Sequence, residues 1–457
     1  MSQADQSAAG NLLNLGLPDG FLWGTSTSSY QIEGGAFEDG RGLSIWDTHC
    51  RQKNRVLNGD TGDVACDHYH RYPEDIRLMQ QLGIQAYRFS VAWPRVMPRG
   101  RGAINVKGLD FYDRLVDGCL EKGIEPWLCL YHWDLPQALG DQGGWINRDI
   151  AGWFADYAAV IACRYGDRVK HFVTFNEPSV STIFGYLLGW NPPAVAEKES
   201  YLQAVHHLNL AHGSAVQVIR SLVPDALIGA VHNIQQVLPC QDTAGDKAAA
   251  AILDAHWNAV FPDPQHLGCY PELVARDFEP YQKAGDMALI CQKQDWFGVN
   301  HYSPIYAKAA DKSELGFAWG DPPAEIEKTE INWPVCPNSF RDVLMLASSR
   351  YQLPVYVTEN GCGGHDAPDA KGEVADTARV RFLERYIAAM AEAVRGGADV
   401  RGYFVWSLLD NFEWNAGFAN RFGIVHVDFA SQKRTIKASG HWYKRLIQAN
   451  SVDAKGR

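Results

Sequence analysis

Two glutamates stand at the ends of two apolar runs that are typical of buried strands. Residues 354–361 read PVYVTENG and deliver Glu359, and residues 171–178 read HFVTFNEP and deliver Glu177. β-Branched and aromatic residues favour strands, and a glycine or proline close behind each glutamate ends the run. A carboxylate at the end of a buried strand costs stability unless it finds partners or a shifted pKa. One such glutamate could cap a helix or form an ion pair, whereas two of the same design indicate a pair of acids facing one site.

Two carboxyl groups without a metal-ligand cluster indicate general acid and nucleophile chemistry on an acetal. If they lie about 5–5.5 Å apart, one carboxylate attacks the anomeric carbon while the other protonates the leaving oxygen. Repulsion between the two charges then separates their pKa values. An arginine beside the nucleophile would keep it ionised, and Arg88, between two aromatic residues, is expected to be a buried guanidinium of this kind. Asn176, next to Glu177, is expected to bind a sugar 2-hydroxyl.

The elements that must position these residues alternate regularly along the chain. Strands are expected at residues 21–27, 86–93, 125–133, 171–177, 227–233, 295–300, 354–359 and 402–408. Helices are expected at residues 73–82, 107–122, 148–165, 201–222, 245–260, 339–350, 376–395 and 435–448. Eight strands that are each followed by a helix predict an α/β fold, a single (β/α)₈ TIM barrel with long loops around the pocket. The alternative, an open doubly wound sheet, would carry a glycine-rich, dinucleotide-binding turn after an early strand. The glycines at residues 34–35 lack the glycine spacing of that turn.

A barrel fold predicts that polar residues at the carboxyl ends of its strands converge at one mouth. Nearly every expected strand ends in a hydrogen-bonding or aromatic residue, as a polyhydroxylated ligand requires. The first strand is expected to run on toward residue 34. Residues 307–338 are expected to form a long surface excursion.

Composition sets the remaining expectations. The 457 residues are 46% hydrophobic, and the net charge of −11 disfavours nucleic acid and anionic membranes as partners. None of the ten cysteines forms a C-x-x-C pair, which fits reduced thiols in a cytoplasmic protein without a metal site. Neither a signal peptide nor a membrane-spanning run is expected. With no break in composition, we expect a flexible segment 1–16, one catalytic domain 17–446 and a tail 447–457.

Six short motifs, in chain order, resemble those of the family-one glycoside hydrolases, the β-glucosidase family. They are FLWG at 21–24 with QIEG at 31–34, YRFS at 87–90, HWDLP at 132–136, TFNEP at 174–178, TENG at 358–361 and WSLLDNFEW at 406–414. The resemblance covers roughly residues 17–446. Six motifs in order at expected strand ends leave little room for chance.

The resemblance implies a role for each matching residue. Glu177 would be the acid/base and Glu359 the nucleophile, supported by Arg88 and Tyr302. The positions matching the family's substrate contacts are Gln31, His132, Asn176, Tyr302, Trp406, Glu413, Trp414 and Phe422. Trp333 would match the tryptophan on the leaving-group side. No metal and no cofactor are implied.

The resemblance also implies the substrate class, a β-glucoside or short cello-oligosaccharide cleaved at its non-reducing end. A phosphoglycosidase would carry a small residue and a phosphate clamp where this chain has Trp414, and a thioglucosidase would lack Glu177.

The sequence departs from the family pattern at two places. The sixth expected strand ends in NHY, so His301 is expected to be structural, and residues 189–193 read GWNPP where the family often has APG. A galactosidase or fucosidase preference and a non-catalytic sugar-binding barrel stay open as alternatives.

Overall fold

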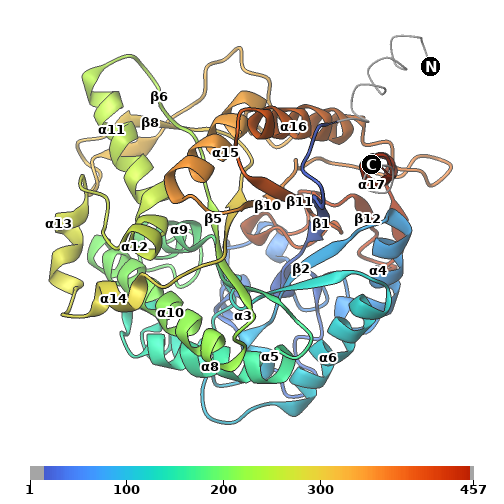
Figure 1. The fold of residues 1–457 in the computed structure, drawn as a ribbon, viewed down its shortest axis with the longest axis horizontal. Helices are drawn as coiled ribbons and strands as arrows, with labels where there is room; N and C mark the ends of the chain where they lie inside the picture. Colours follow the sequence, from blue (N-terminus) through green and yellow to red (C-terminus); the bar gives the residue numbers. More distant parts are fainter. Residues whose placement is uncertain (1–14, 453–457) are drawn as a thin grey trace.

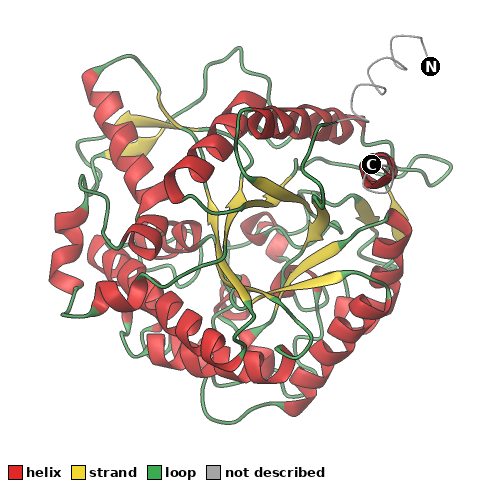
Figure 2. Cartoon of the chain, viewed as in Figure 1, coloured by secondary structure: helices red, strands yellow, loops and turns green. Residues whose placement is uncertain are grey.

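The structure is a computed structural model that describes residues 15–452. Its centre is a closed barrel of parallel strands in the order β1-β11-β10-β7-β5-β4-β3-β2 (Figures 1 and 2), which confirms the predicted fold class. The barrel strands are β1 (Leu22–Ser26), β2 (Ala86–Ser90), β3 (Glu125–Cys129), β4 (His171–Asn176), β5 (Leu227–Asn233), β7 (Trp296–Asn300), β10 (Val355–Asn360) and β11 (Val400–Trp406). Pairing of β1 with β11, from Leu22 opposite Gly402 to Ser26 opposite Trp406, closes the ring.

Helices surround the strands (Figure 2). The longer ones are α4 (His68–Leu82), α6 (Val106–Glu121), α8 (Ile150–Tyr165), α10 (Lys198–Leu222), α11 (Ala244–Asp254), α15 (Pro337–Tyr351), α16 (Thr377–Arg395) and α17 (Ala438–Val452). Short ones lie in the connections: α2 (Ser29–Ile32), α3 (Ile45–Cys50), α5 (Trp93–Val96), α7 (Gln137–Gly140), α9 (Pro178–Thr182), α12 (Pro262–Leu267), α13 (Ala275–Phe278) and α14 (Asp286–Ile290). Within residues 15–452, two segments are π-helical, η3 (Ile183–Leu187) and η4 (Ala255–Ala259).

The interior of the barrel is filled by side chains. A cluster of buried residues packs there: Ala86, Trp127, Cys129, Val173, Val231, Trp296 and Phe404. The Trp127 ring lies 5.0 Å from the rings of both Trp296 and Phe404, between centroids. Burying a large apolar side chain stabilises the fold by about 1.5–3 kcal/mol. Because the barrel is solid, a ligand can reach the strand ends only at the mouth.

Several expected boundaries are wrong. The first strand stops at Ser26 and is followed by α2, because the parallel pairing with β11 ends there. The third strand ends at Cys129, four residues early, where its pairing with β4 ends. Helix α4 begins at His68, so Pro73 lies inside it and not near its start. The helical hydrogen bonding starts from the carbonyl of Asp67, which accepts from the amide of Arg71 at 2.9 Å.

Residues 307–338 are more ordered than expected. Two strands, β8 (Ile305–Ala309) and β9 (Phe317–Trp319), join β6 (Val237–Pro239) in a small sheet beside α11, outside the barrel (Figure 1). The pairing partner β6 lies far away in sequence, so no local pattern marks this sheet.

Helix α17, at the end of the described chain, continues to Val452, past the boundary expected at residue 446. The expected flexible segment lies outside the described residues up to residue 14.

Candidate active site

A cavity of about 590 Å³ opens at the carboxyl ends of the barrel strands. Both Glu177 and Glu359 line it. Other predicted site residues that line it are His132, Tyr302, Trp333, Trp406, Glu413, Trp414 and Phe422. The strand ends therefore converge as the barrel geometry requires.

Glu359 is the fifth residue of β10 and is buried. Its Oε1 forms an ion pair with a guanidinium nitrogen of Arg88, which is also buried. Its Oε2 accepts a 2.6 Å hydrogen bond from the hydroxyl of Tyr302. Burial raises the pKa of Glu359, while the charge of Arg88 and the hydrogen bond from Tyr302 act in the opposite direction. These two partners favour the ionised carboxylate, which is the form a nucleophile needs.

Glu177 follows β4 in a left-handed backbone conformation, with a φ of +48°. Its partners are neutral amides: Nδ2 of Asn233 donates to Oε1 at 2.7 Å, and Nδ2 of Asn300 donates at 2.8 Å. Burial raises the pKa of Glu177 to about 8, and the negative charge of Glu359 adds to the effect. At neutral pH this carboxyl can therefore hold a proton, as a general acid must.

Asn176 connects the two carboxyl groups from behind the cavity wall. Its Oδ1 accepts from Nη1 of Arg88 at 2.8 Å and from Nδ2 of Asn300 at 3.1 Å. Its Nδ2 lies 3.1 Å from Nε2 of His132. Asn176 is buried and is not among the lining residues. In this arrangement it orients Arg88, Asn300 and His132, and the structure does not test a contact with a sugar hydroxyl.

The inner end of the cavity is aromatic. The ring of His132 is roughly parallel to the rings of Trp406 and Trp414, with centroids 5.8 and 5.9 Å apart. Trp414 packs in turn against Trp46 and Trp133, each at 4.6 Å between centroids. Flat faces of this kind suit the apolar face of a sugar ring and close the cavity beyond it.

Two polar atoms at this end have no hydrogen-bond partner among the described residues, Nδ1 of His132 and Oε1 of Glu413. Buried polar groups are nearly always paired, so both are candidates for contacts to ligand hydroxyls. Burial raises the pKa of Glu413 well above its ordinary value, and the charge of Glu359 adds to the effect. Burial and the charge of Arg88 lower the pKa of His132, which keeps its ring neutral.

Gln31 lies behind this end and not on the cavity surface. Its Nε2 donates to Oδ1 of Asn411 at 3.0 Å and to the carbonyl of Phe412 at 2.9 Å, and its Oε1 accepts from Ser28 at 2.6 Å. These bonds hold the loop that leads to Glu413. The expected sugar contact of Gln31 remains a prediction.

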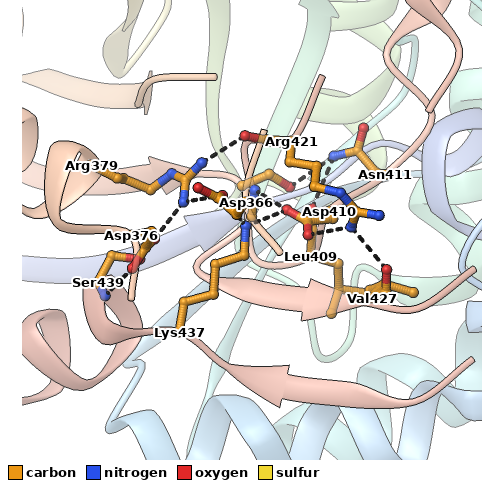
Figure 3. A network of polar contacts seen from close by, with 12 residues as sticks. Asp366, Asp376, Arg379, Leu409, Asp410, Asn411, Arg421, Val427, Lys437 and Ser439 are labelled. Carbon is orange, nitrogen blue, oxygen red and sulfur yellow. Dashed lines mark hydrogen bonds and ion pairs between the residues drawn. The ribbon is translucent and has the colours of Figure 1, made fainter. Parts of the chain in front are cut away.

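A buried network of ion pairs anchors the loop that carries Glu413 and Trp414 (Figure 3). Its charged members are Asp366, Asp376, Arg379, Asp410, Arg421 and Lys437. Lys437 is fully buried, and its Nζ lies 2.6 Å from Oδ1 of Asp410 and 2.6 Å from Oδ2 of Asp366. Asp410 stands three residues before Glu413, so the network fixes the backbone that carries Glu413 and Trp414 to the cavity.

The outer part of the cavity carries Trp333, a residue that is 39% exposed. Its ring packs against Tyr302 at 5.5 Å and Phe422 at 5.7 Å between centroids. His301, next to Tyr302, points away: its Nδ1 lies 2.8 Å from the carbonyl of Ile234, and its ring stacks on Phe340. The contacts of His301 are those of a structural residue.

Comparison with known proteins identifies the family. The profile of glycosyl hydrolase family 1 matches residues 14–452. The chain belongs to this family. β-Glucosidase A of Thermotoga maritima is 44% identical over 441 residues, which cover 95% of this chain and 98% of that protein. A 1,4-β-D-glucan glucohydrolase of Thermotoga neapolitana is 44% identical over 440 residues, covering 95% and 99%.

Comparison with solved structures gives the same family. The family 1 β-glucosidase from Thermotoga maritima in complex with isofagomine lactam matches with a TM-score of 0.91 at 44% identity, covering 95% of this chain and 99% of that chain.

Within residues 15–452, no group of three or more histidine, cysteine, aspartate or glutamate side chains could hold a metal ion. None of the helices described is long and apolar enough to cross a bilayer.

Sequence reasoning about this family 1 site missed two kinds of residue. Asn233 and Asn300 stand at strand ends, but nothing local shows that both donate to Glu177. Four aromatic residues of the outer cavity were also missed: Phe184, Trp190, Trp257 and Trp319. The departure from the family pattern at residues 189–193 was a signal for Trp190 alone.

Proposed function

We propose that this protein is a retaining exo-β-glucosidase that releases terminal β-D-glucosyl residues from β-glucosides and short cello-oligosaccharides. The observation that carries the proposal is the contrast between two carboxyl groups in one cavity. Glu359 is bound by a guanidinium and a tyrosine hydroxyl, whereas Glu177 is bound by neutral amides and has a raised pKa. One group is thereby suited to attack and the other to donate a proton.

In the first step, the carboxylate of Glu359 attacks the anomeric carbon and forms a glucosyl ester. The bond from that carbon to the leaving oxygen breaks, and the proton of Glu177 moves to that oxygen. Arg88 and Tyr302 orient the attacking carboxylate through the contacts they make with its two oxygens. Positive charge that develops on the sugar ring is stabilised by Glu359 itself.

In the second step, Glu177 acts as the base. It takes a proton from water, the water oxygen attacks the anomeric carbon, and the ester to Glu359 breaks. Two inversions give net retention of the β configuration. Both residues return to their starting protonation states, and the scheme uses no metal or cofactor.

The shape of the cavity supports release of one terminal sugar. Trp414, which lines the cavity and packs against Trp46 and Trp133, would block further sugar units beyond the one that is released. The names of the relatives from Thermotoga maritima and Thermotoga neapolitana favour glucosides over a galactosidase or fucosidase preference. The complete pair of carboxyl groups disfavours a non-catalytic sugar-binding barrel. For location we propose the cytoplasm, because all ten cysteines are free and half of them are buried, which fits a reducing compartment.

The proposal is tested by following hydrolysis of an aryl β-glucoside by proton NMR from the first seconds. Retention predicts that β-glucose forms first and mutarotates later. First release of the α-anomer would contradict the double displacement. The absence of hydrolysis for any β-glucoside would contradict the assigned activity.

A further inference from the structure

The two carboxyl oxygens of Glu177 have different surroundings. Oε1 accepts both amide hydrogen bonds, from Nδ2 of Asn233 at 2.7 Å and from Nδ2 of Asn300 at 2.8 Å. An amide N–H can only donate, so Oε1 serves as an acceptor and the proton of the neutral carboxyl belongs on Oε2. Because Glu177 lines the cavity, Oε2 is the oxygen left to meet the leaving group. A general acid needs its proton within hydrogen-bond reach of the atom that receives it.

The orientation of the Asn233 amide is set by two donors on its carbonyl oxygen. Oδ1 accepts from Nε1 of Trp257 at 3.1 Å and from Nε2 of Gln235 at 2.6 Å. An indole N–H donates and never accepts. A half-turn of the Asn233 amide would place its amino group against the indole N–H and its oxygen against Oε1 of Glu177. Trp257 and Gln235 therefore hold the Asn233 amide with its donor toward the acid/base.

Gln235 is itself held with its donor toward Asn233. Its Oε1 accepts from the backbone amide of Ser303 at 3.3 Å, and a backbone amide can only donate. Its own backbone amide donates to Oδ1 of Asn258 at 3.0 Å, and Nδ2 of Asn258 donates to its carbonyl at 2.7 Å. The side chain of Gln235 is buried, and the segment η4 supplies both Asn258 and Trp257. The amides of Gln235 and Asn233 thus each have one orientation that satisfies their partners.

We propose that Gln235 and Trp257 are positioning residues of the proposed acid: their donors aim the Asn233 amide so that the acid proton stays on the oxygen that meets the leaving group. The proposal rests on the proposed function. If the Asn233 amide turned over, its oxygen would accept a hydrogen bond from a proton on Oε1 of Glu177, and the leaving oxygen would lose its donor. Loss of both positioning residues should therefore impair reactions that need the proton and spare those that do not.

The test measures kcat/KM of Gln235→Met, Trp257→Phe and the double variant on two aryl glucosides. Phenyl β-glucoside has a leaving oxygen that needs a proton, whereas dinitrophenyl β-glucoside has one that does not, and both leaving groups are single rings. On phenyl β-glucoside we expect a loss of about threefold in each single variant, where one donor remains, and of about tenfold or more in the double variant. On dinitrophenyl β-glucoside the loss should stay below about twofold. The control is Gln236→Met, because the neighbouring Gln236 is half-buried and does not line the cavity.

The pH profile of the double variant gives a second readout. The hydrogen bond from Asn233 lowers the pKa of Glu177, so a weaker bond should move the alkaline limb on phenyl β-glucoside to higher pH. Structural damage alone would lower the rate without moving the limb. Four other titratable groups that interact with Glu177 are unchanged in the variants: Arg88, Tyr302, Glu359 and Glu413.

The positioning residues must also act through Asn233. In an Asn233→Ala background, Gln235→Met should cause no further loss on phenyl β-glucoside, because the amide that it positions is gone. A further loss of about threefold there would overturn the inference. So would equal losses of the double variant on both substrates, an alkaline limb that stays in place, or rates that match the wild type. A wild type that hydrolyses neither substrate would instead refute the proposed function, so the two failures are distinguishable.

Discussion

At the scale of single residues, the two carboxyl groups of the cavity differ in their partners more than in their burial. Both are buried, but among residues 15–452 only Glu359 has a cationic partner in contact, Arg88. The sequence predicted this contact, because an arginine between aromatic strand residues has to find a buried acid. It did not predict that Asn233 and Asn300 both donate to Glu177, because that depends on how three strands register with one another.

The raised pKa of Glu177 predicts the alkaline side of the pH profile. Because the acid must be protonated, the alkaline limb of kcat/KM should begin near pH 8, above which the value falls tenfold per unit. The hydrogen bond from Asn233 lowers this pKa, so Asn233→Ala should raise it and shift the alkaline limb to higher pH. Initial rates on cellobiose from pH 5 to pH 10 provide the measurement. A limb that stays in place or moves to lower pH would contradict the assignment of Glu177.

At the scale of elements, the loop that carries Glu413 and Trp414 depends on the buried ion network of Figure 3.

The barrel strands and main helices were predictable because their apolar periodicity is strong, and β5 has the expected bounds. The small sheet of β6, β8 and β9 was not, since short strands show little pattern and their pairing joins distant segments. The π-helical segments η3 and η4 have no sequence signature either.

The network predicts a large stability effect for Lys437→Met. Lys437 and Asp410 are both fully buried, and removal of the ammonium leaves the three aspartates of the network against two arginines. Breaking a buried pair in this way costs about 3–5 kcal/mol in the free energy of unfolding. Urea denaturation gives the value, and Lys433→Met, at an exposed site of the same region, is the control, with a change within about 0.5 kcal/mol. A loss below about 1 kcal/mol for Lys437→Met would show that the network is not a stabilising anchor.

At the scale of the whole molecule, the barrel joins the two ends of the described chain. β1 pairs with β11, and the hydroxyl of Tyr443 on α17 donates to the carbonyl of Gly24 at 2.9 Å. The barrel therefore cannot close unless both ends of the chain are present. The sequence, which shows no break in composition, also predicted one catalytic domain.

Closure predicts one cooperative unfolding transition. Tryptophan fluorescence and far-UV circular dichroism should give the same midpoint in urea, because a barrel that loses one strand loses its closure. A chain truncated after residue 395, without β11 and α17, should fail to fold. Two separate transitions, or a folded truncated chain, would contradict a single unit.

The most direct test of the central claim, that Glu177 is the acid/base and Glu359 the nucleophile, is the reaction of Glu177→Ala with azide. On dinitrophenyl β-glucoside, whose leaving group needs no proton, the variant should retain much of its glycosylation rate. On unactivated glucosides it should lose on the order of 10²–10⁴ in rate. Added azide should accelerate turnover of the activated substrate and yield β-glucosyl azide, because an anion needs no base and no longer meets a repelling carboxylate. If azide has no effect and both kinds of substrate lose activity equally, Glu177 is not the acid/base and the account is wrong.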